Sequence, residues 1–209
     1  MKLINLTHPI TSGYYSFPND PKLSITQQGT IDANQYNISK ITTGSHQGTH
    51  LDAMYHFFED GRTIDNMPLD WFYGPARILR IPKEVGSEIS VEDLLPHEQF
   101  LQSEARIIIE TGWHRNFGSP AFFESFPSLT IPAAEFLAEK KIRMLGMDMP
   151  SLGEAYYELH RILLAPQVEV VVVESLANLD KVPDSFIFSG FPLNLTGLDG
   201  SPIRAVAIC

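Results

Sequence analysis

The sequence predicts a mixed α/β fold, with a mixed sheet, helices packed on it and a barrel-like or second β layer. Strand-like segments outnumber helical ones, above all in the first third of the chain. The middle of the chain alternates between helix and strand, as layered folds with helices on a sheet do. The most hydrophobic strand-like run covers residues 168–174 and predicts a buried strand. We expect one domain over residues 1–209, because no linker, repeat or low-complexity segment divides the chain.

The individual strands and helices are predicted from the local pattern of side chains and from the residues at the segment ends. Residues 35–43 alternate β-branched and polar side chains, which predicts a strand that leads into a histidine-rich segment. A second predicted strand over residues 76–81 ends at Pro82. Ser90, with an acidic residue three positions on, is typical of a helix start. Further strands are expected over residues 106–110, 142–147, 168–174, 186–193 and 203–208, and helices over residues 132–141 and 154–164.

Three of the predicted strands end on residues that suit a binding site. Gly112 follows the strand over residues 106–110, and Asp148 and Glu174 come at the ends of later strands. Ligands gather at the strand ends of α/β sheets, so we expect site residues at these three positions.

Composition excludes several classes of function. The chain has 15 Lys and Arg against 25 Asp and Glu, and the net charge of −10 disfavours nucleic acid as a partner. No apolar run approaches the roughly 20 residues that span a bilayer, so we expect no membrane partner. The single cysteine, Cys209, rules out an intrachain disulfide and fits a reducing compartment. A soluble cytoplasmic protein is therefore expected.

The most informative segment is a concentration of metal-ligand chemistry over residues 46–56. His46, His50, Asp52 and His56 fall within these eleven residues, although the whole chain has only seven histidines. Neutral imidazole and carboxylate are the preferred ligands of zinc, manganese and iron. The alternative is that these histidines only satisfy hydrogen bonds in a polar turn, but the density of four candidate ligands favours a metal site.

The spacing within the segment indicates how the ligands meet. On an extended strand, His50 and Asp52 lie two residues apart and point to the same side. A turn at Gly48 and Thr49 can bring His46 back toward them. His56 is either a further ligand or a general base beside the metal.

The pattern His-x-Gly-Thr-His-x-Asp-Ala-x-x-His resembles the signature of the cyclase family of metal-dependent hydrolases, to which bacterial kynurenine formamidase and isatin hydrolase belong. Further segments resemble the family in the same order along most of the chain. They are Phe17-Pro18-Asn19-Asp20, Thr111-Gly112-Trp113, Asp148-Met149-Pro150-Ser151, His160 with Glu174 and residues 176–179, and residues 199–205.

The resemblance implies a swivelling β/β/α domain with a centre of two divalent metal ions, zinc ahead of manganese. It implies that His46, His50 and Asp52 bind one ion, that Asp52 bridges, and that His160 and Glu174 bind the second. Taken alone, a histidine on an amphipathic helix such as His160 is usually an ordinary residue. Glu174 has independent support, because a carboxylate that ends a run of valines needs a partner if it is buried.

The resemblance also implies a reaction and a substrate class. His56 is the expected acid/base, and water activated by the metals would cleave a C–N amide bond, with N-formylkynurenine as the leading small-molecule substrate. Alternatives are hydrolysis of another cyclic amide or ester, as in isatin hydrolase, and a metal- or ligand-binding protein without catalysis. A bare binding site has no need of His56, which favours catalysis. The family further implies a homodimer whose partner helps to close the active site.

Two departures from the family pattern bear on the substrate. Met54 stands where the family usually has proline, and we expect it to shape the substrate pocket. Phe17 stands where kynurenine formamidases usually carry tryptophan, and we expect it to bind substrate. Aromatic side chains can stack on an aromatic substrate, although each can equally serve core or dimer packing. The candidates are Tyr14, Tyr15, Phe17, Trp71, Phe72 and Trp113.

Overall fold

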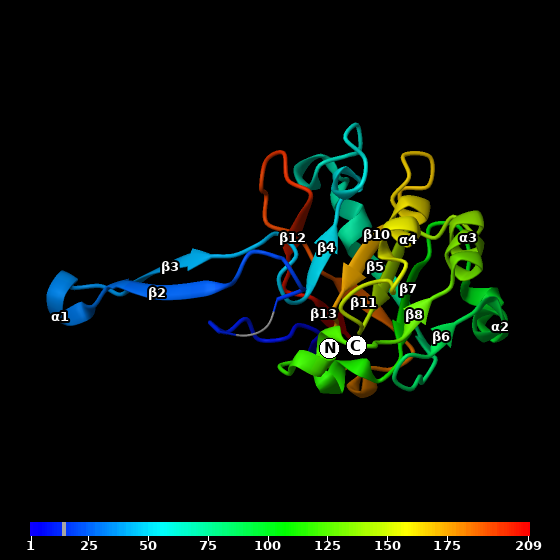
Figure 1. Cartoon of the computed structure of the whole chain (residues 1–209), viewed down its shortest axis with the longest axis horizontal. Coiled ribbons are helices and arrows are strands. Elements are labelled where there is room, and N and C mark those ends of the chain that lie inside the picture. Colours follow the sequence, from blue (N-terminus) through cyan, green and yellow to red (C-terminus); the bar gives the residue numbers. More distant parts are fainter. Residues whose placement is uncertain (14–15) are drawn as a thin grey trace.

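The computed structural model describes residues 1–13 and 16–209, which build one large mixed sheet with helices against it (Figure 1). Nine strands form this sheet in the order β1-β13-β11-β5-β7-β9-β10-β4-β12. Their bounds are β1 Leu3–Asn5, β4 His50–Asp52, β5 Tyr73–Arg80, β7 Arg106–Glu110, β9 Met144–Met147, β10 Val171–Glu174, β11 Ser185–Ser189, β12 Gly200–Pro202 and β13 Val206–Ile208. The expected mixed sheet with packed helices is confirmed.

The centre of the sheet is parallel and its two sides are antiparallel. Strands β5, β7, β9 and β10 run parallel to one another. On one side β11, β13 and β1 follow in antiparallel order, and on the other side β4 pairs with both β10 and β12. The sheet curls into a half-barrel, which corresponds to the barrel-like layer expected from the sequence. Parallel strands are covered on both faces, and β10 is accordingly buried along its whole length.

Three helices lie together beside the parallel strands (Figure 1). They are α2 (Val91–Leu94), α3 (Ile131–Glu139) and α4 (Tyr156–Leu163). The predicted start at Ser90 is confirmed, because Ser90 and Asp93 form a capping box. Helix α3 begins after Thr130, whose side chain accepts from the backbone N–H of Ala133, and carries proline in its first turn.

The strands that the sequence analysis missed are those with weak intrinsic preference for a strand. β12 consists of Gly, Ser and Pro, and it is extended because it pairs with β4. β2 (Ser24–Gly29) is mostly polar, and among the described strands it pairs with β3 (Ile38–Thr42) alone. The two-residue strands β6 (Glu88–Ile89) and β8 (Ser128–Leu129) pair with each other beside the helices.

The hairpin of β2 and β3 projects from the body as an arm, with the short helix α1 (Ile31–Asn34) at its tip (Figure 1). Every residue of β3 is exposed. The arm contains several large apolar side chains that are more than half exposed, namely Ile31, Tyr36, Ile38 and Ile41. It therefore presents apolar surface that the described part of the chain does not cover.

Among the described residues, no helix is long and apolar enough to cross a membrane.

Candidate metal centre

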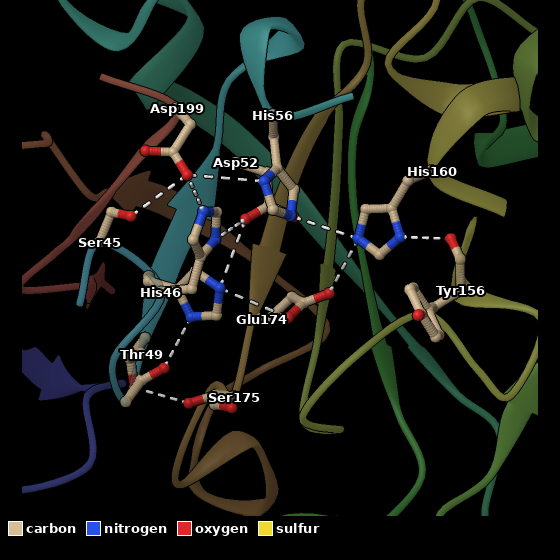
Figure 2. A network of polar contacts seen from close by, with 12 residues as sticks. Ser45, His46, Thr49, Asp52, His56, Tyr156, His160, Glu174, Ser175 and Asp199 are labelled. Atoms are coloured by element: carbon tan, nitrogen blue, oxygen red, sulfur yellow. Dashed lines mark hydrogen bonds and ion pairs between the residues drawn. The ribbon is translucent and has the colours of Figure 1, made fainter. Parts of the chain in front are cut away.

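The position of β4 between β10 and β12 brings the predicted ligands together. His50 and Asp52 lie on the same face of β4, because side chains two apart on a strand share a face. Glu174 pairs with His50 across the β10–β4 ladder. His160, from helix α4, approaches the same carboxylates (Figure 2). Four predicted ligands that are far apart in the sequence thus meet at one face of the sheet. They are His50, Asp52, His160 and Glu174.

Backbone carbonyls fix which ring nitrogen of two histidines carries the proton. Nδ1 of His50 lies 2.8 Å from the carbonyl oxygen of Gly48, and Nδ1 of His160 lies 2.6 Å from that of Tyr156. A carbonyl oxygen can only accept, so Nδ1–H is the donor in both rings. In the neutral form of each ring, Nε2 is left with a lone pair, the form in which histidine binds metals.

Both Nε2 atoms face carboxylate oxygens. His50 Nε2 lies 3.3 Å from Asp52 Oδ1 and 3.4 Å from Glu174 Oε2. His160 Nε2 lies 3.4 Å from Asp52 Oδ2 and also 3.4 Å from Glu174 Oε1. All four side chains are buried. Two imidazole lone pairs and two carboxylates at this distance repel one another unless a cation or added protons lie between them.

Three atoms of this cluster have no hydrogen-bond partner in the described chain, although each is fully buried. They are His50 Nε2, Asp52 Oδ2 and Glu174 Oε1. Native proteins satisfy buried polar atoms almost without exception, so an unpartnered group requires an explanation. A divalent cation supplies one, because it accepts electron pairs from imidazole and carboxylate alike. The residues present therefore fit a bound metal ion.

His46 stands beside this cluster with a carboxylate on each side. Its Nδ1 lies 2.8 Å from Asp52 Oδ1, and its Nε2 lies 2.7 Å from Asp199 Oδ2. Burial lowers the pKa of His46, but the hydrogen bonds with Asp199 and Asp52 outweigh it and raise the pKa to about 10. The site thus attracts positive charge at His46.

The same electrostatic field acts on the rest of the cluster. Burial opposes a charged His160, yet its close contacts with the carboxylates of Asp52 and Glu174 raise its pKa to about 10. Burial also opposes a charged Asp52, but the adjacent imidazoles of His160, His46 and His50 hold its pKa well below the usual range. A field that stabilises protons on His46 and His160 also stabilises a divalent cation in their place.

The loop before β4 turns as the sequence predicted. Gly48 has φ of 65°, a left-handed conformation that glycine adopts without strain. Thr49 then donates from Oγ1 to the carbonyl oxygen of Ser175 at 2.6 Å, which ties the loop to the end of β10. The turn brings the ring of His46 to 5.1 Å from that of His50.

Asp199, which we did not propose as a site residue, belongs to the cluster. Its Oδ2 lies 2.7 Å from His46 Nε2 and 3.6 Å from His56 Nδ1, and it accepts from Ser45 Oγ at 3.2 Å (Figure 2). The hydrogen bond with His46, and then the contact with His56, lower the pKa of Asp199. The available signal was the family-like segment over residues 199–205, whose acidic first residue precedes the strand that pairs with β4.

His56 lies at the edge of the cluster and lines a cavity. It follows β4 in a short 3-10 helix over Met54–His56. Its ring stacks on that of His46 at 4.0 Å, and 29% of its side chain is exposed. It is less enclosed than His50 and His160, whose side chains are each only 4% exposed. His56 therefore contacts both the candidate ligands and the space that a substrate would enter.

The cavity has a volume of about 290 Å³ and combines the polar cluster with aromatic walls. His46, His50, His56, His160 and Glu174 line it on one side. Its aromatic lining residues are Phe17, Phe57, Phe117, Phe123 and Tyr156. An apolar cavity with a few convergent polar groups is the usual form of a small-molecule site.

Several expected contributors lie elsewhere. Met54 is fully buried in the core rather than in the cavity wall, and it occupies the first position of its helix, where proline is tolerated. Trp71, Phe72 and Trp113 are also buried in the core and do not line the cavity. Tyr14 and Tyr15 lie outside the described residues.

Of the three strand ends singled out, Glu174 alone belongs to the cluster. The carboxylate of Asp148 is occupied by hydrogen bonds from the backbone of Thr111 and Gly112 and from the Thr111 hydroxyl. Asp148 also lies 3.2 Å from His114 Nδ1. Its saturated contacts show a structural role, and neither Gly112 nor Asp148 lines the cavity.

Comparison with known proteins gives consistent matches. A family model described as "Putative cyclase" matches residues 4–154. A kynurenine formamidase of Bacillus cytotoxicus is 32% identical over 209 residues, 97% of this chain and 95% of that protein. A predicted metal-dependent hydrolase from Bacillus stearothermophilus has a TM-score of 0.82 at 27% identity, covering 99% and 97% of the two chains. Isatin hydrolase A from Labrenzia aggregata shares the fold, with a TM-score of 0.88 at 22% identity over 99% and 93%.

Proposed function

Because this chain belongs to the cyclase family of metal-dependent hydrolases, we propose that it hydrolyses the C–N bond of an aryl formamide, with N-formylkynurenine as the leading substrate. The similarity to kynurenine formamidase along 97% of this chain supports the reaction class. The observation that carries the proposal is the buried pair of Nε2 atoms, on His50 and His160, that faces two carboxylates in an arrangement that a bound cation would satisfy.

The proposed ligand set uses two groups of residues that share one carboxylate. His46, His50 and Asp52 form one group, and Asp52, His160 and Glu174 form the other. In each group the candidate ligand atoms lie within 4.8 Å of one another. Each group would hold one divalent ion, with Asp52 shared between the two groups and zinc ahead of manganese. When bound, such ions polarise a carbonyl and lower the pKa of a bound water.

His56 has the proposed role of proton donor to the leaving nitrogen. In hydrolysis, water oxygen bonds to the formyl carbon, the C–N bond breaks, and the products are formate and an amine that has gained a proton. Asp199 faces the Nδ1 side of His56, so the proposal assigns this proton transfer to Nε2. The position of His56 at the cavity wall supports the assignment.

The deciding experiment is a turnover assay of metal-loaded protein with N-formylkynurenine, isatin and simple aryl formamides. We expect formate release from the aryl formamides, and we expect His56→Ala to retain metal and fold while losing turnover. His97→Ala provides a matched control, because His97 lies in a different 3-10 helix away from the cavity. Unchanged formamide hydrolysis in His56→Ala would remove His56 from the mechanism, and absence of hydrolysis by fully loaded wild type would refute the proposed reaction.

A homodimer in the cytoplasm completes the proposal. A two-stranded ribbon is marginally stable in water on its own, and the arm of β2 and β3 exposes Ile38 and Ile41 by 52% and 63%. A second copy that packs on this arm would remove these side chains from water. The single cysteine, the exposed Cys209, is compatible with a reducing compartment.

Analytical ultracentrifugation tests the assembly. Wild type is expected to sediment as a dimer, and the double variant Ile38→Asp with Ile41→Asp as a monomer. Val85→Asp is the control, because Val85 is equally apolar and 70% exposed but lies outside the arm. A dimer that survives the double variant would show that the arm is not the interface.

A further inference from the structure

A β-turn contributes an aromatic residue and an acidic residue to the lining of the same cavity. Residues Phe17 to Asp20 form a β-turn, in which the backbone N–H of Asp20 donates to the carbonyl oxygen of Phe17 at 3.0 Å. Pro18 takes the second position, and Asn19 takes the third with φ of 75°. Proline followed by a left-handed residue is the pattern of a type II turn.

The aromatic member of the turn is fixed by neighbouring rings. Phe17 lies edge-on to Phe123 at 6.1 Å and to Tyr156 at 6.5 Å between ring centroids. All three rings line the cavity. Edge-to-face contacts of this kind are favourable, so the Phe17 ring holds one position against which a planar substrate can pack.

The acidic member of the turn, Asp20, has no counter-ion among the described residues. Asp20 lines the cavity and is partly buried, and within residues 1–13 and 16–209 it forms no ion pair with a lysine or arginine. Its neighbour Lys22 is exposed and does not line the cavity. No lysine or arginine of the described chain lines this cavity at all, whereas Asp20 and Glu174 both do.

This distribution of charge distinguishes between substrates that share an aryl formamide. A substrate chain that ends in an ammonium group gains a charge-assisted partner in Asp20. A substrate chain that ends in a carboxylate and lies against the turn meets a like charge at Asp20, and no lysine or arginine of the described cavity lining offsets that charge. An α-amino acid such as N-formylkynurenine combines both groups, so only its ammonium group is matched by the turn.

We propose that the Phe17–Asp20 turn is a specificity element that selects aryl formamides with a cationic side chain over those with an anionic one. The inference rests on the proposed aryl formamide hydrolysis and adds the charge class of the preferred substrate. Phe17 supplies the surface for the ring, and Asp20 supplies the partner for the ammonium group.

Three matched probes test this inference on the metal-loaded full chain. Each carries a formamide beside an aryl ketone, and the ketone chain ends in an ammonium group, a methyl group or a carboxylate. We expect kcat/KM to be highest for the ammonium probe and lowest for the carboxylate probe. In Asp20→Asn the ratio of ammonium to carboxylate kcat/KM is expected to fall by about tenfold or more, and in Asp20→Lys the preference is expected to reverse.

The ratio separates recognition from a general loss of activity, because a structural defect lowers all three rates together. Asp60→Asn, at an exposed aspartate outside both the cavity lining and the arm, is the matched control and is expected to keep the wild-type ratio. Turnover with the same ratio in wild type and Asp20→Asn would overturn this inference while leaving the proposed reaction intact.

A binding measurement keeps the inference testable without turnover. Calorimetry with the deformylated amine products is expected to show tighter binding of the ammonium product than of the carboxylate product, and loss of that difference in Asp20→Asn. Equal binding of the two products by wild type would overturn the inference, whereas lack of turnover alone would refute only the proposed reaction.

Discussion

The Oδ2 atom of Asp199 lies 3.6 Å from Nδ1 of His56 and contacts His46 Nε2 at 2.7 Å. One carboxylate thus joins the proposed proton donor to a proposed metal ligand. A carboxylate behind a histidine fixes the ring orientation and the proton position, and such outer partners are often worth about 10- to 100-fold in metal affinity or activity.

We therefore predict that Asp199→Asn lowers kcat by roughly 10- to 100-fold, with a smaller change in KM. The asparagine amide has the same shape as the Asp199 carboxylate, but it lacks the negative charge that holds the His56 imidazole in position. Steady-state kinetics with metal content measured on the same sample separates an effect on His56 from metal loss through His46. Asp184→Asn is the control, because Asp184 pairs with Arg80 outside the cavity. Equal rates in Asp199→Asn and wild type would contradict the positioning role.

Gly200 is predicted to be required for the position of His46. A Cβ atom at residue 200 would lie 2.7 Å from His46 Cε1 and 2.8 Å from the backbone carbonyl oxygen of Leu51. Real Cβ atoms do not approach so closely, so Gly200→Ala must displace the His46 ring or part β12 from β4. We expect a several-fold loss of metal affinity and of turnover, measured by metal titration and by formate release.

Gly44→Ala is the matched control for that substitution. Gly44 lies in the loop just before His46, and a Cβ there would meet only Pro21 at an ordinary 3.5 Å. Metal affinity should stay within about twofold of wild type. If both glycine variants lose metal to the same degree, the loss reflects the loop in general and the contact with His46 is not its cause.

Much of the fold and most of the cluster were predictable because local patterns and global packing agree there. The strand over residues 106–110 is all apolar in its centre and bounded by a Thr-Gly turn, and it was predicted with its observed bounds. His50 and Asp52 share a face by strand geometry alone. In these segments the conformation that each residue favours locally is also the conformation that packing in the sheet requires.

The features that escaped prediction depend on pairing between distant segments. Asp199 joins the site because β12 pairs with β4, and nothing in the composition of Gly-Ser-Pro indicates a strand. Met54 was expected in the cavity because it is two residues from His56, but the 3-10 helix turns its side chain into the core. Sequence proximity to a site residue does not determine direction where the backbone is irregular.

The number of metal ions per chain is predicted from the shared ligand Asp52. Wild type is expected to hold two ions, His160→Ala one, and His50→Ala with Asp52→Ala none, by elemental analysis after dialysis. Asp52 has to be replaced for both metal ions to be lost, because it belongs to both ligand groups. Bound ions also stabilise the fold, by about 2.7 kcal/mol when their free concentration is 100 times Kd, so chelator should lower the unfolding temperature of wild type. Full occupancy in the double variant would refute the ligand assignment.

His8 is predicted to make the protein less stable in mild acid. Its Nε2 is buried without a hydrogen-bond partner in the described chain, and its ring stacks on Phe117 at 3.7 Å. Burial, and then the charge of His114, lower the pKa of His8 from 6.5 to about 4, although Asp148 acts in the opposite direction.

The lowered pKa sets the direction of the pH effect. Between pH 6.5 and 4 the unfolded chain binds a proton at this position that the folded protein does not, so the free energy of unfolding falls as pH falls through this window. The His8 contribution is complete above pH 6.5, and up to about 3 kcal/mol of it is lost near pH 4. His8→Phe keeps an aromatic ring against Phe117 and removes the titrating group.

Urea unfolding at pH 7.5 and at pH 4.5 measures this contribution directly. The loss of unfolding free energy between the two pH values should be smaller in His8→Phe than in wild type, because other groups titrate equally in both proteins and cancel in the comparison. His97→Phe, with the same substitution at a histidine outside the core, should retain the wild-type pH dependence. Parallel pH dependences in His8→Phe and wild type would show that burial of His8 does not oppose its protonation.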